Sequence, residues 1–145
     1  MKKNGIVFDI KKTNNLLLKA LSERYKEMMI DITPIQSKVL TTIYESKEEV
    51  TGAYIEKKVH CNKSSMSSIL NSLEKKGYIT KTGDKKDTRK KIIKLTNRAL
   101  SLIRILERDA KEVEHNLMIG ITVDEYEAFK WVLDKIEMNI ERMKR

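Results

Sequence analysis

The stretch NKSSMSSILNSLEKKG, residues 62–77, decides the fold of this chain. Four of its apolar residues recur at intervals of three and four, so they form one stripe along a helix. These residues are Met66, Ile69, Leu70 and Leu73. Asn62 is a favourable N-cap, and Gly77 stands where the end of the helix needs a left-handed backbone. The stretch therefore predicts an amphipathic helix with one face in the core and the other in solvent.

The solvent face of this helix is made of small polar residues and a lysine. Its predicted members are Lys63, Ser64, Ser65, Ser67, Ser68 and Asn71. Serine and asparagine are poor helix formers, and a face selected for stability alone would more often carry Glu, Lys, Ala or Gln. Short hydroxyls and an amide let a helix backbone come close to base edges and phosphates, so these six residues are predicted to bind DNA. A plain solvated face with a serine-rich cap is the alternative.

Another helix is expected directly before this one. Residues 52–59 form a predicted short helix, and residues 60–62 form a tight turn. Further upstream, the sequence TPIQ offers Thr33 as a cap, Pro34 at the first helical position and Gln36 to complete a capping box. Two helices joined by a tight turn, with a polar face on the second, are typical of a helix-turn-helix.

A basic hairpin is predicted after the helix-turn-helix. Two β-like runs, 78–82 and 91–96, flank a loop at 83–90. The sequence GDKKDTRKK, residues 83–91, holds five Lys or Arg residues and two Asp. An arginine at such a tip suits a narrow minor groove, where the negative potential is enhanced. The loop residues predicted to bind DNA are Lys86, Asp87, Arg89 and Lys90. A solvated turn with incidental lysines is the alternative.

The positive charge of the chain is concentrated in one third of its length. The 145 residues carry a net charge of +9. Residues 51–98 contain 13 Lys or Arg and four Asp or Glu, whereas the remainder contains 17 of each sign. A local basic field of this kind attracts polyanions, although charge alone is equally compatible with a solvated surface.

Both ends of the chain are expected to be helical. One proline and five glycines leave few interruptions, and the apolar periodicity predicts helices over 10–29 and 97–118. Thr122 and Glu125 form a capping box for a last helix. The expected fold class is mainly α, a winged helix-turn-helix with a small β-hairpin wing between N- and C-terminal helices. Its lobes, not independent of one another, are 1–32, 33–98 and 99–145.

Three segments together resemble the MarR family of multiple-antibiotic-resistance regulators. They are TPIQSKVL, CNKSSMSSILNSLEKKGYI and DKKDTRKKIIKLT, all within 33–98 of a resemblance that spans roughly 10–145. The most specific feature is Asp87-x-Arg89, followed by alternating residues that lead into Lys-Leu-Thr. Ser68 stands where many relatives have an arginine, which puts a strong guanine contact in doubt, and Ala99 replaces a frequent glycine.

This resemblance implies an obligate dimer that binds DNA. The terminal lobes, 1–32 and 99–145, would form the dimerisation lobe. The second helix of the helix-turn-helix would enter the major groove, and Arg89 the minor groove. A small anionic or phenolic effector is also implied, held where the DNA-binding lobe meets the dimerisation lobe. Tyr25, Met28 and Met29 are the candidate residues for that ligand site.

The sequence gives little support to a disulfide-bonded, membrane-spanning, metal-binding or enzymatic protein. A single cysteine, Cys61, leaves no disulfide framework and fits a reducing, cytoplasmic location; a core role and a redox role are both open for it. No apolar run approaches the ~18 residues of a membrane span. His60 and His115 lack companion metal ligands, and no catalytic constellation or phosphate-binding glycine loop is visible. We therefore expect no enzyme, metal site, cofactor or membrane partner.

The sequence thus predicts a sequence-specific transcriptional regulator of double-stranded DNA. Its expected form is a ligand-responsive repressor that binds a palindromic operator as a homodimer. Two alternatives remain open at this point. A winged-helix protein-interaction module would bind through its neutral terminal helices and have little affinity for DNA. An architectural DNA-binding protein would bind all duplexes alike, with a steep dependence on salt.

Overall fold

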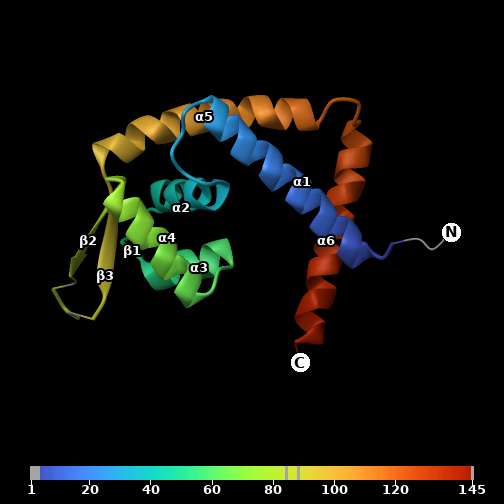
Figure 1. The fold of residues 1–145 in the computed structure, drawn as a ribbon. Coiled ribbons are helices and arrows are strands. Elements are labelled where there is room, and N and C mark those ends of the chain that lie inside the picture. The colour runs from blue at the N-terminus through green and yellow to red at the C-terminus, as the bar shows by residue number, and fades with distance from the viewer. Residues whose placement is uncertain (1–3, 84, 88, 145) are drawn as a thin grey trace. The chain divides into compact units, whose positions relative to one another are not determined.

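The computed structural model describes residues 4–83, 85–87 and 89–144. It is mainly helical with a small antiparallel sheet, which confirms the expected fold class (Figure 1). The chain divides into two compact units, Met1–Leu106 and Glu107–Arg145. Two residues of the expected wing loop, Asp84 and Thr88, lie outside the described residues.

The first unit begins with two helices. Helix α1 spans Ile6–Glu27, so it starts four residues before the expected 10–29 and ends two residues earlier. Its earlier start adds a turn whose apolar side chains are exposed, and a core-facing periodicity does not detect such a turn. Helix α2 spans Pro34–Glu45 and begins with the predicted capping box. The Thr33 side chain accepts a hydrogen bond from the Gln36 backbone N–H at 3.3 Å, and Gln36 Oε1 accepts from the Thr33 N–H at 3.1 Å.

The predicted helix-turn-helix is present. Helix α3 spans Gly52–Val59 and helix α4 spans Lys63–Lys75. His60 has a left-handed backbone with φ 56°, which turns the chain, and the Asn62 side chain accepts from the Ser65 N–H at 2.8 Å as the cap of α4. Gly77 ends the following turn at φ +83°, as the sequence predicted.

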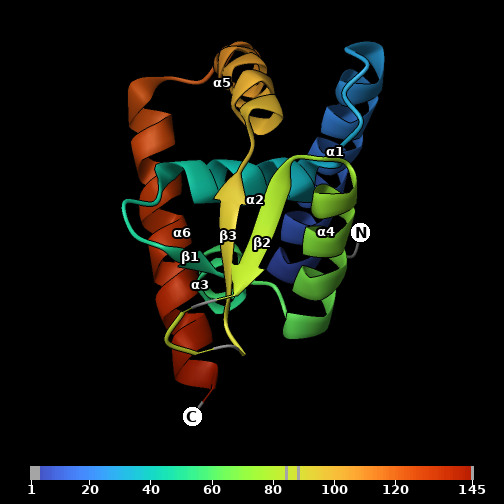
Figure 2. The same ribbon diagram turned by 90° about the vertical axis from the view of Figure 1, so that its left-hand side faces the viewer.

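A three-stranded antiparallel sheet completes the winged fold. Strands β2, Ile79–Gly83, and β3, Lys91–Leu95, form the expected hairpin within one residue of its predicted limits. Strand β1, Val50–Thr51, pairs with the other side of β3, so the strand order is β1-β3-β2 (Figure 2). The sequence did not predict β1, because two residues are too short to show a β-type alternation.

The apolar stripe of α4 lies in the core of the first unit. Met66, Leu70 and Leu73 are buried, and Ile69 packs at the edge of the same cluster. Burial of each such side chain contributes about 1.5–3 kcal/mol, so this stripe fixes the rotation of α4 about its axis. The other fully buried large side chains of the unit are Val39, Leu40, Ile55, Ile79 and Ile103.

The second unit contains the end of α5 and all of α6. Helix α5, Asn97–Leu117, begins in the first unit, where Ala99, Leu102 and Ile103 are buried. Helix α6, Val123–Met143, starts with the predicted capping box. Hydrogen bonds from the backbone and side chain of Thr122 lower the pKa of Glu125 there. None of the described helices combines the length and hydropathy that a membrane span requires.

Candidate nucleic-acid interface

The outer face of α4 is polar along its whole length. Every residue that the sequence assigned to this face is exposed: Lys63, Ser64, Ser65, Ser67, Ser68 and Asn71. The buried stripe on the other side of the helix is what turns this face outward. A helix with small side chains on an exposed face can approach the floor of a major groove closely.

The first turn of α4 adds donors to this face. The Asn62 side chain accepts a hydrogen bond from the Ser65 N–H, and the Asn62 carbonyl accepts one from the Met66 N–H at 3.0 Å. The amides of Lys63 and Ser64 precede the first intrahelical bond, so they point out of the helix end together with its partial positive charge. Such an end, with a lysine beside it, suits a phosphate oxygen.

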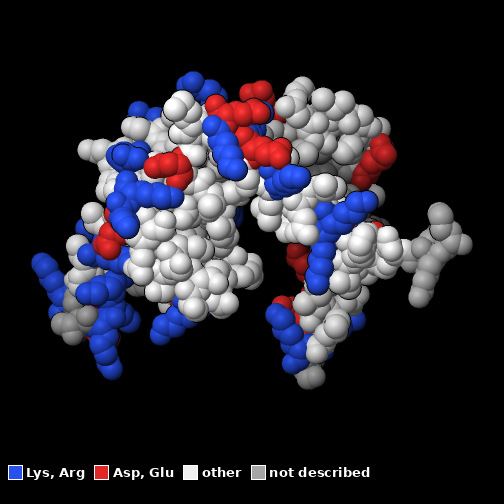
Figure 3. Space-filling view, in the orientation of Figure 1, with Lys and Arg blue, Asp and Glu red and all other residues white. Residues whose placement is uncertain are grey.

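The wing presents its arginine to solvent. Asp87 Oδ1 accepts from the Arg89 N–H at 3.0 Å and lies 3.4 Å from Arg89 Nε. The Arg89 side chain is nevertheless 92% exposed, so its terminal nitrogens stay accessible. Lys and Arg side chains gather around the wing in Figure 3. Lys85, Lys86 and Lys90, all in the wing loop, are exposed. Asp87 therefore shapes the turn and restrains the guanidinium, while the surrounding surface is basic.

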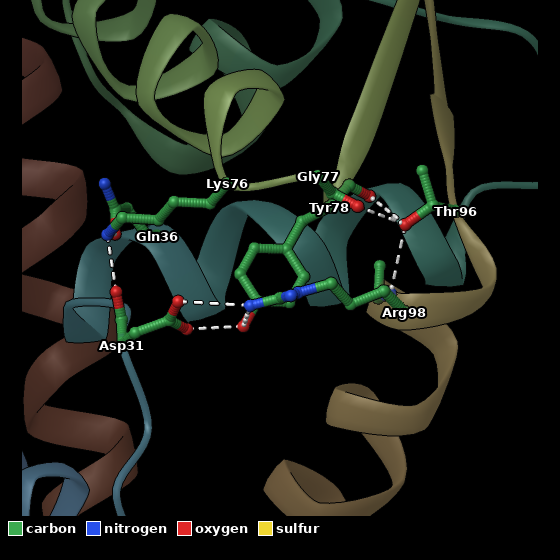
Figure 4. Close-up of polar contacts among 8 residues, drawn as sticks. Asp31, Gln36, Lys76, Gly77, Tyr78, Thr96 and Arg98 are labelled. Carbon is green, nitrogen blue, oxygen red and sulfur yellow. Dashed lines mark hydrogen bonds and ion pairs between the residues drawn. The ribbon is translucent and has the colours of Figure 1, made fainter.

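A polar cluster holds the C-terminal end of α4 in place (Figure 4). Its centre is Asp31, in the linker between α1 and α2. The Tyr78 hydroxyl and the Lys76 ammonium both donate to Asp31, to its carboxylate and its backbone carbonyl respectively. Arg98, at the start of α5, lies 3.3 Å from the Asp31 carboxylate and stacks on the Tyr78 ring with 4.7 Å to the centroid. The cluster thus joins the linker, the end of α4 and the start of α5.

The electrostatics of this cluster favour a neutral tyrosine between two charged partners. Burial raises the pKa of Tyr78, and the hydrogen bond to the Asp31 carboxylate raises it further. The contact with Tyr78 also raises the pKa of Arg98. Sequence reasoning missed this cluster, because Asp31 is 47 residues from Tyr78 and 67 from Arg98. No local pattern could have revealed it.

The three predicted ligand-site residues have different surroundings. Tyr25 is buried, and its hydroxyl donates to Ser37 Oγ at 2.9 Å. Met28 is partly exposed, and Met29 is 91% exposed with a left-handed backbone. Tyr25 therefore belongs to the core of the first unit, whereas Met29 lies in solvent.

The sequence also contains a cysteine and possible metal ligands. Cys61 is half-buried with a free thiol and packs at the edge of the core cluster. In the part of the chain that the structure describes, no group of three or more His, Cys, Asp or Glu residues is placed to hold a metal ion.

These features define a class of protein, the winged helix-turn-helix proteins. Within that class, residues 30–90 match the model of the MarR family. The match covers α2, α3, α4 and the first part of the wing. Residues 30–90 are thus similar to the winged helix-turn-helix of the MarR family, and the members of that family are transcriptional regulators and not enzymes. The resemblance drawn from the sequence is confirmed.

Solved structures show that the likeness in fold extends over nearly the whole chain. The Staphylococcus aureus MepR–DNA complex matches with a TM-score of 0.87 and 23% identity, over 94% of this chain and 99% of that one. A MarR protein from Peptoclostridium difficile matches with a TM-score of 0.84 and 19% identity, over 99% and 92%. Streptococcus pneumoniae FabT in complex with DNA matches with a TM-score of 0.76 and 20% identity, over 95% and 96%.

Proposed function

We propose that this protein is a sequence-specific transcriptional regulator that binds an inverted-repeat operator as a homodimer. The observation that carries the proposal is the division of α4, which buries its apolar stripe in the core and exposes a continuous face of small polar residues. The solved DNA complexes of similar fold, from S. aureus and S. pneumoniae, support DNA as the partner.

In the proposed complex, α4 lies in the major groove. Ser64, Ser67 and Ser68 offer hydroxyls that both donate and accept, and Asn71 offers an amide to the base edges. Lys63 and the free amides of the first turn bind a phosphate, which positions the helix without reading sequence. Ser65 belongs to the same exposed face, and it supplies the N–H that the Asn62 cap engages.

The wing provides the second contact. Arg89 enters the minor groove beside α4, restrained by Asp87, and the neighbouring Lys86 and Lys90 bind the phosphates on either side. Phosphate contacts of this kind supply much of the affinity and make it dependent on salt.

The terminal helices provide the dimer. The start of α1 leaves Ile6, Val7 and Phe8 between 49% and 64% exposed, and α6 leaves Phe129 and Val132 at least half exposed. In the proposal, the lobes 1–32 and 99–145 cover these surfaces with a second copy, and 33–98 binds DNA. Two-fold symmetry then places the two α4 helices about one turn of DNA apart, ~34 Å.

The proposal includes repression and its release by a small anionic or phenolic effector. A ligand that binds the DNA-released state more tightly shifts the population away from the operator. Tyr25, Met28 and Met29 are the proposed contacts. A thermal-shift screen of aromatic carboxylates and phenols checks this part, and the absence of any stabilising compound would count against it.

Selection from random duplex DNA at near-physiological salt tests the main proposal. We expect the purified protein to enrich one inverted repeat with half-sites about one turn apart. Binding without enrichment would instead indicate an architectural protein. A protein without affinity for any duplex would point to the protein-interaction module. Ser67→Ala, which alters the exposed face of α4, is the test variant in this selection. Lys85→Ala is its control, because it removes only an exposed charge of the wing.

A further inference from the structure

A half-buried lysine on β2 lies against α4. Lys81 shares the inner side of β2 with the buried Ile79, since residues two apart on a strand point to the same side. Helix α4 packs against β2, and the Lys81 side chain is only 19% exposed. An ammonium that has lost this much water needs acceptors close by.

A hydrogen-bond acceptor and an ion-pair partner of this ammonium lie on α4. Lys81 Nζ donates a hydrogen bond to Oδ1 of Asn71 and lies 3.7 Å from Oε1 of Glu74. A lysine has donors only, so the oxygen of the Asn71 amide faces it and the nitrogen does not. Charge-assisted bonds are roughly twice as strong as neutral ones. Lys81 therefore fixes which way round the Asn71 amide sits.

The fixed amide decides what Asn71 can read. An asparagine recognises adenine by accepting from N6 through its oxygen while donating to N7 through its nitrogen. Lys81 occupies one of the two lone pairs of the oxygen and holds that oxygen towards β2, so Asn71 presents the two hydrogens of its nitrogen to DNA. Guanine suits this arrangement best, because it offers two acceptors, O6 and N7, in the major groove.

We infer that Lys81 is a specificity-determining positioning residue, which holds Asn71 as a hydrogen-bond donor and so favours guanine over adenine at the base that Asn71 faces. The inference rests on the proposed function, since it requires that α4 reads the major groove. Lys81 does not touch the base in this account. It acts through the orientation of Asn71.

Selection from random duplex DNA by the wild type and by variants of Lys81 and Asn71 tests the inference. Lys81→Met keeps the aliphatic stem and frees the Asn71 oxygen, so we expect one position in each half-site to shift from guanine towards adenine by about five- to tenfold. Lys81→Arg retains a charged donor, so this variant should keep the base preference of the wild type. In the Asn71→Ala background, Lys81→Met should change no preference further.

The matched control is Lys91→Met, at an exposed lysine of β3. We expect this variant to lose affinity for all sequences alike, because it removes charge without changing an amide. The inference is overturned if Lys81→Met behaves in the same way, or if the wild type already selects adenine at the position that depends on Asn71. If the wild type enriches no sequence, the proposed function itself fails.

A second measurement needs no DNA. The side-chain amide signals of Asn71 in the NMR spectrum of the free protein report its hydrogen bond directly. We expect them to move in Lys81→Met and to stay in place in Lys91→Met. Unmoved signals in Lys81→Met would show that the lysine does not hold the amide, and would overturn the inference for a folded variant.

Discussion

Helices α4 and α6 are both amphipathic, yet they leave opposite kinds of surface uncovered. Helix α4 buries Met66, Leu70 and Leu73 within its own unit and exposes its polar side. Helix α6 fully buries none of its described residues, and several of its large apolar side chains are exposed. Phe129, for example, is 57% exposed.

This difference shows what each helix still requires. Exposure of apolar surface to water costs roughly 25 cal/mol per Å². A helix such as α6 is therefore stabilised when another protein surface covers its apolar side. A polar, basic surface such as that of α4 and the wing gains nothing from an apolar partner and attracts a polyanion. Helix α1 resembles α6 in this respect, because Tyr25 is its only buried residue.

The largest effect is expected from a charge on the apolar side of α6. Val132→Lys would place an unpaired ammonium in the proposed dimer interface, at a cost of about 3 kcal/mol or more, roughly a hundredfold in the dimer dissociation constant. Sedimentation should then show a monomer with weakened DNA binding. Asp134→Lys, on the polar side of the same helix, serves as the control. A Val132→Lys protein that remains dimeric would remove α6 from the interface.

A smaller loss is expected when the two faces of α4 are changed in turn. Leu70→Ala empties part of the core and should lower the free energy of unfolding by about 2–5 kcal/mol. Ser68→Ala, on the exposed face, should change it by no more than about 0.5 kcal/mol while altering DNA affinity. Urea denaturation and operator binding separate the two effects. Equal stability losses would show that the Ser68 face is structural.

The wing is expected to affect DNA binding alone. Arg89→Ala should weaken operator binding by about 1–3 kcal/mol, because it removes a groove contact. Fluorescence anisotropy measures this loss, and sedimentation and circular dichroism should show an unchanged dimer and helicity. Lys85→Ala, which removes a neighbouring exposed charge, should have a smaller effect. An affinity unaltered by Arg89→Ala would exclude the wing from the mechanism.

The smallest effect concerns the cluster at the end of α4. Burial and Asp31 raise the pKa of Tyr78 above its ordinary value of 10.0, so the folded protein favours the neutral phenol. Stability from this preference is complete below about pH 10 and is lost as the pH rises through the raised pKa. Asp31→Asn should lower the pKa of Tyr78 part of the way towards its ordinary value, because the burial of the Tyr78 side chain remains.

An NMR titration of ¹³C-labelled tyrosine measures this pKa, with Tyr78→Phe to assign the signal. The ion pair between Asp31 and Arg98 is partly exposed, so its loss should cost no more than about 1 kcal/mol. A Tyr78 signal that titrates at the ordinary value would show that the cluster does not form in solution.

Local signals in the sequence were accurate. The capping boxes at Thr33 and Thr122, the cap at Asn62 and the left-handed Gly77 all lie where the sequence placed them. Each involves residues within a few positions of one another, so the sequence alone holds the information. The same holds for the stripe of α4, because helical spacing fixes which side chains share a face.

Contacts between distant segments were missed. Strand β1 forms only because Val50 meets Ile93 across the sheet. The hydrogen bonds of Asp31 with Tyr78 and Arg98 require that α2, α4 and α5 pack together. The contact between Lys81 and Asn71 has the same origin, since the two residues belong to different elements. The sequence predicted Asn71 only as a DNA-binding residue, without a partner in the protein.

The sequence by itself determined the helix-turn-helix, the basic wing and the family that they resemble. Periodicity, capping and charge are local properties, and they specify which faces are apolar and which are polar. Only the tertiary structure decided which polar groups hold one another and which remain for a partner. That choice depends on side chains brought together from distant positions, where burial removes water and makes each remaining donor select a particular acceptor.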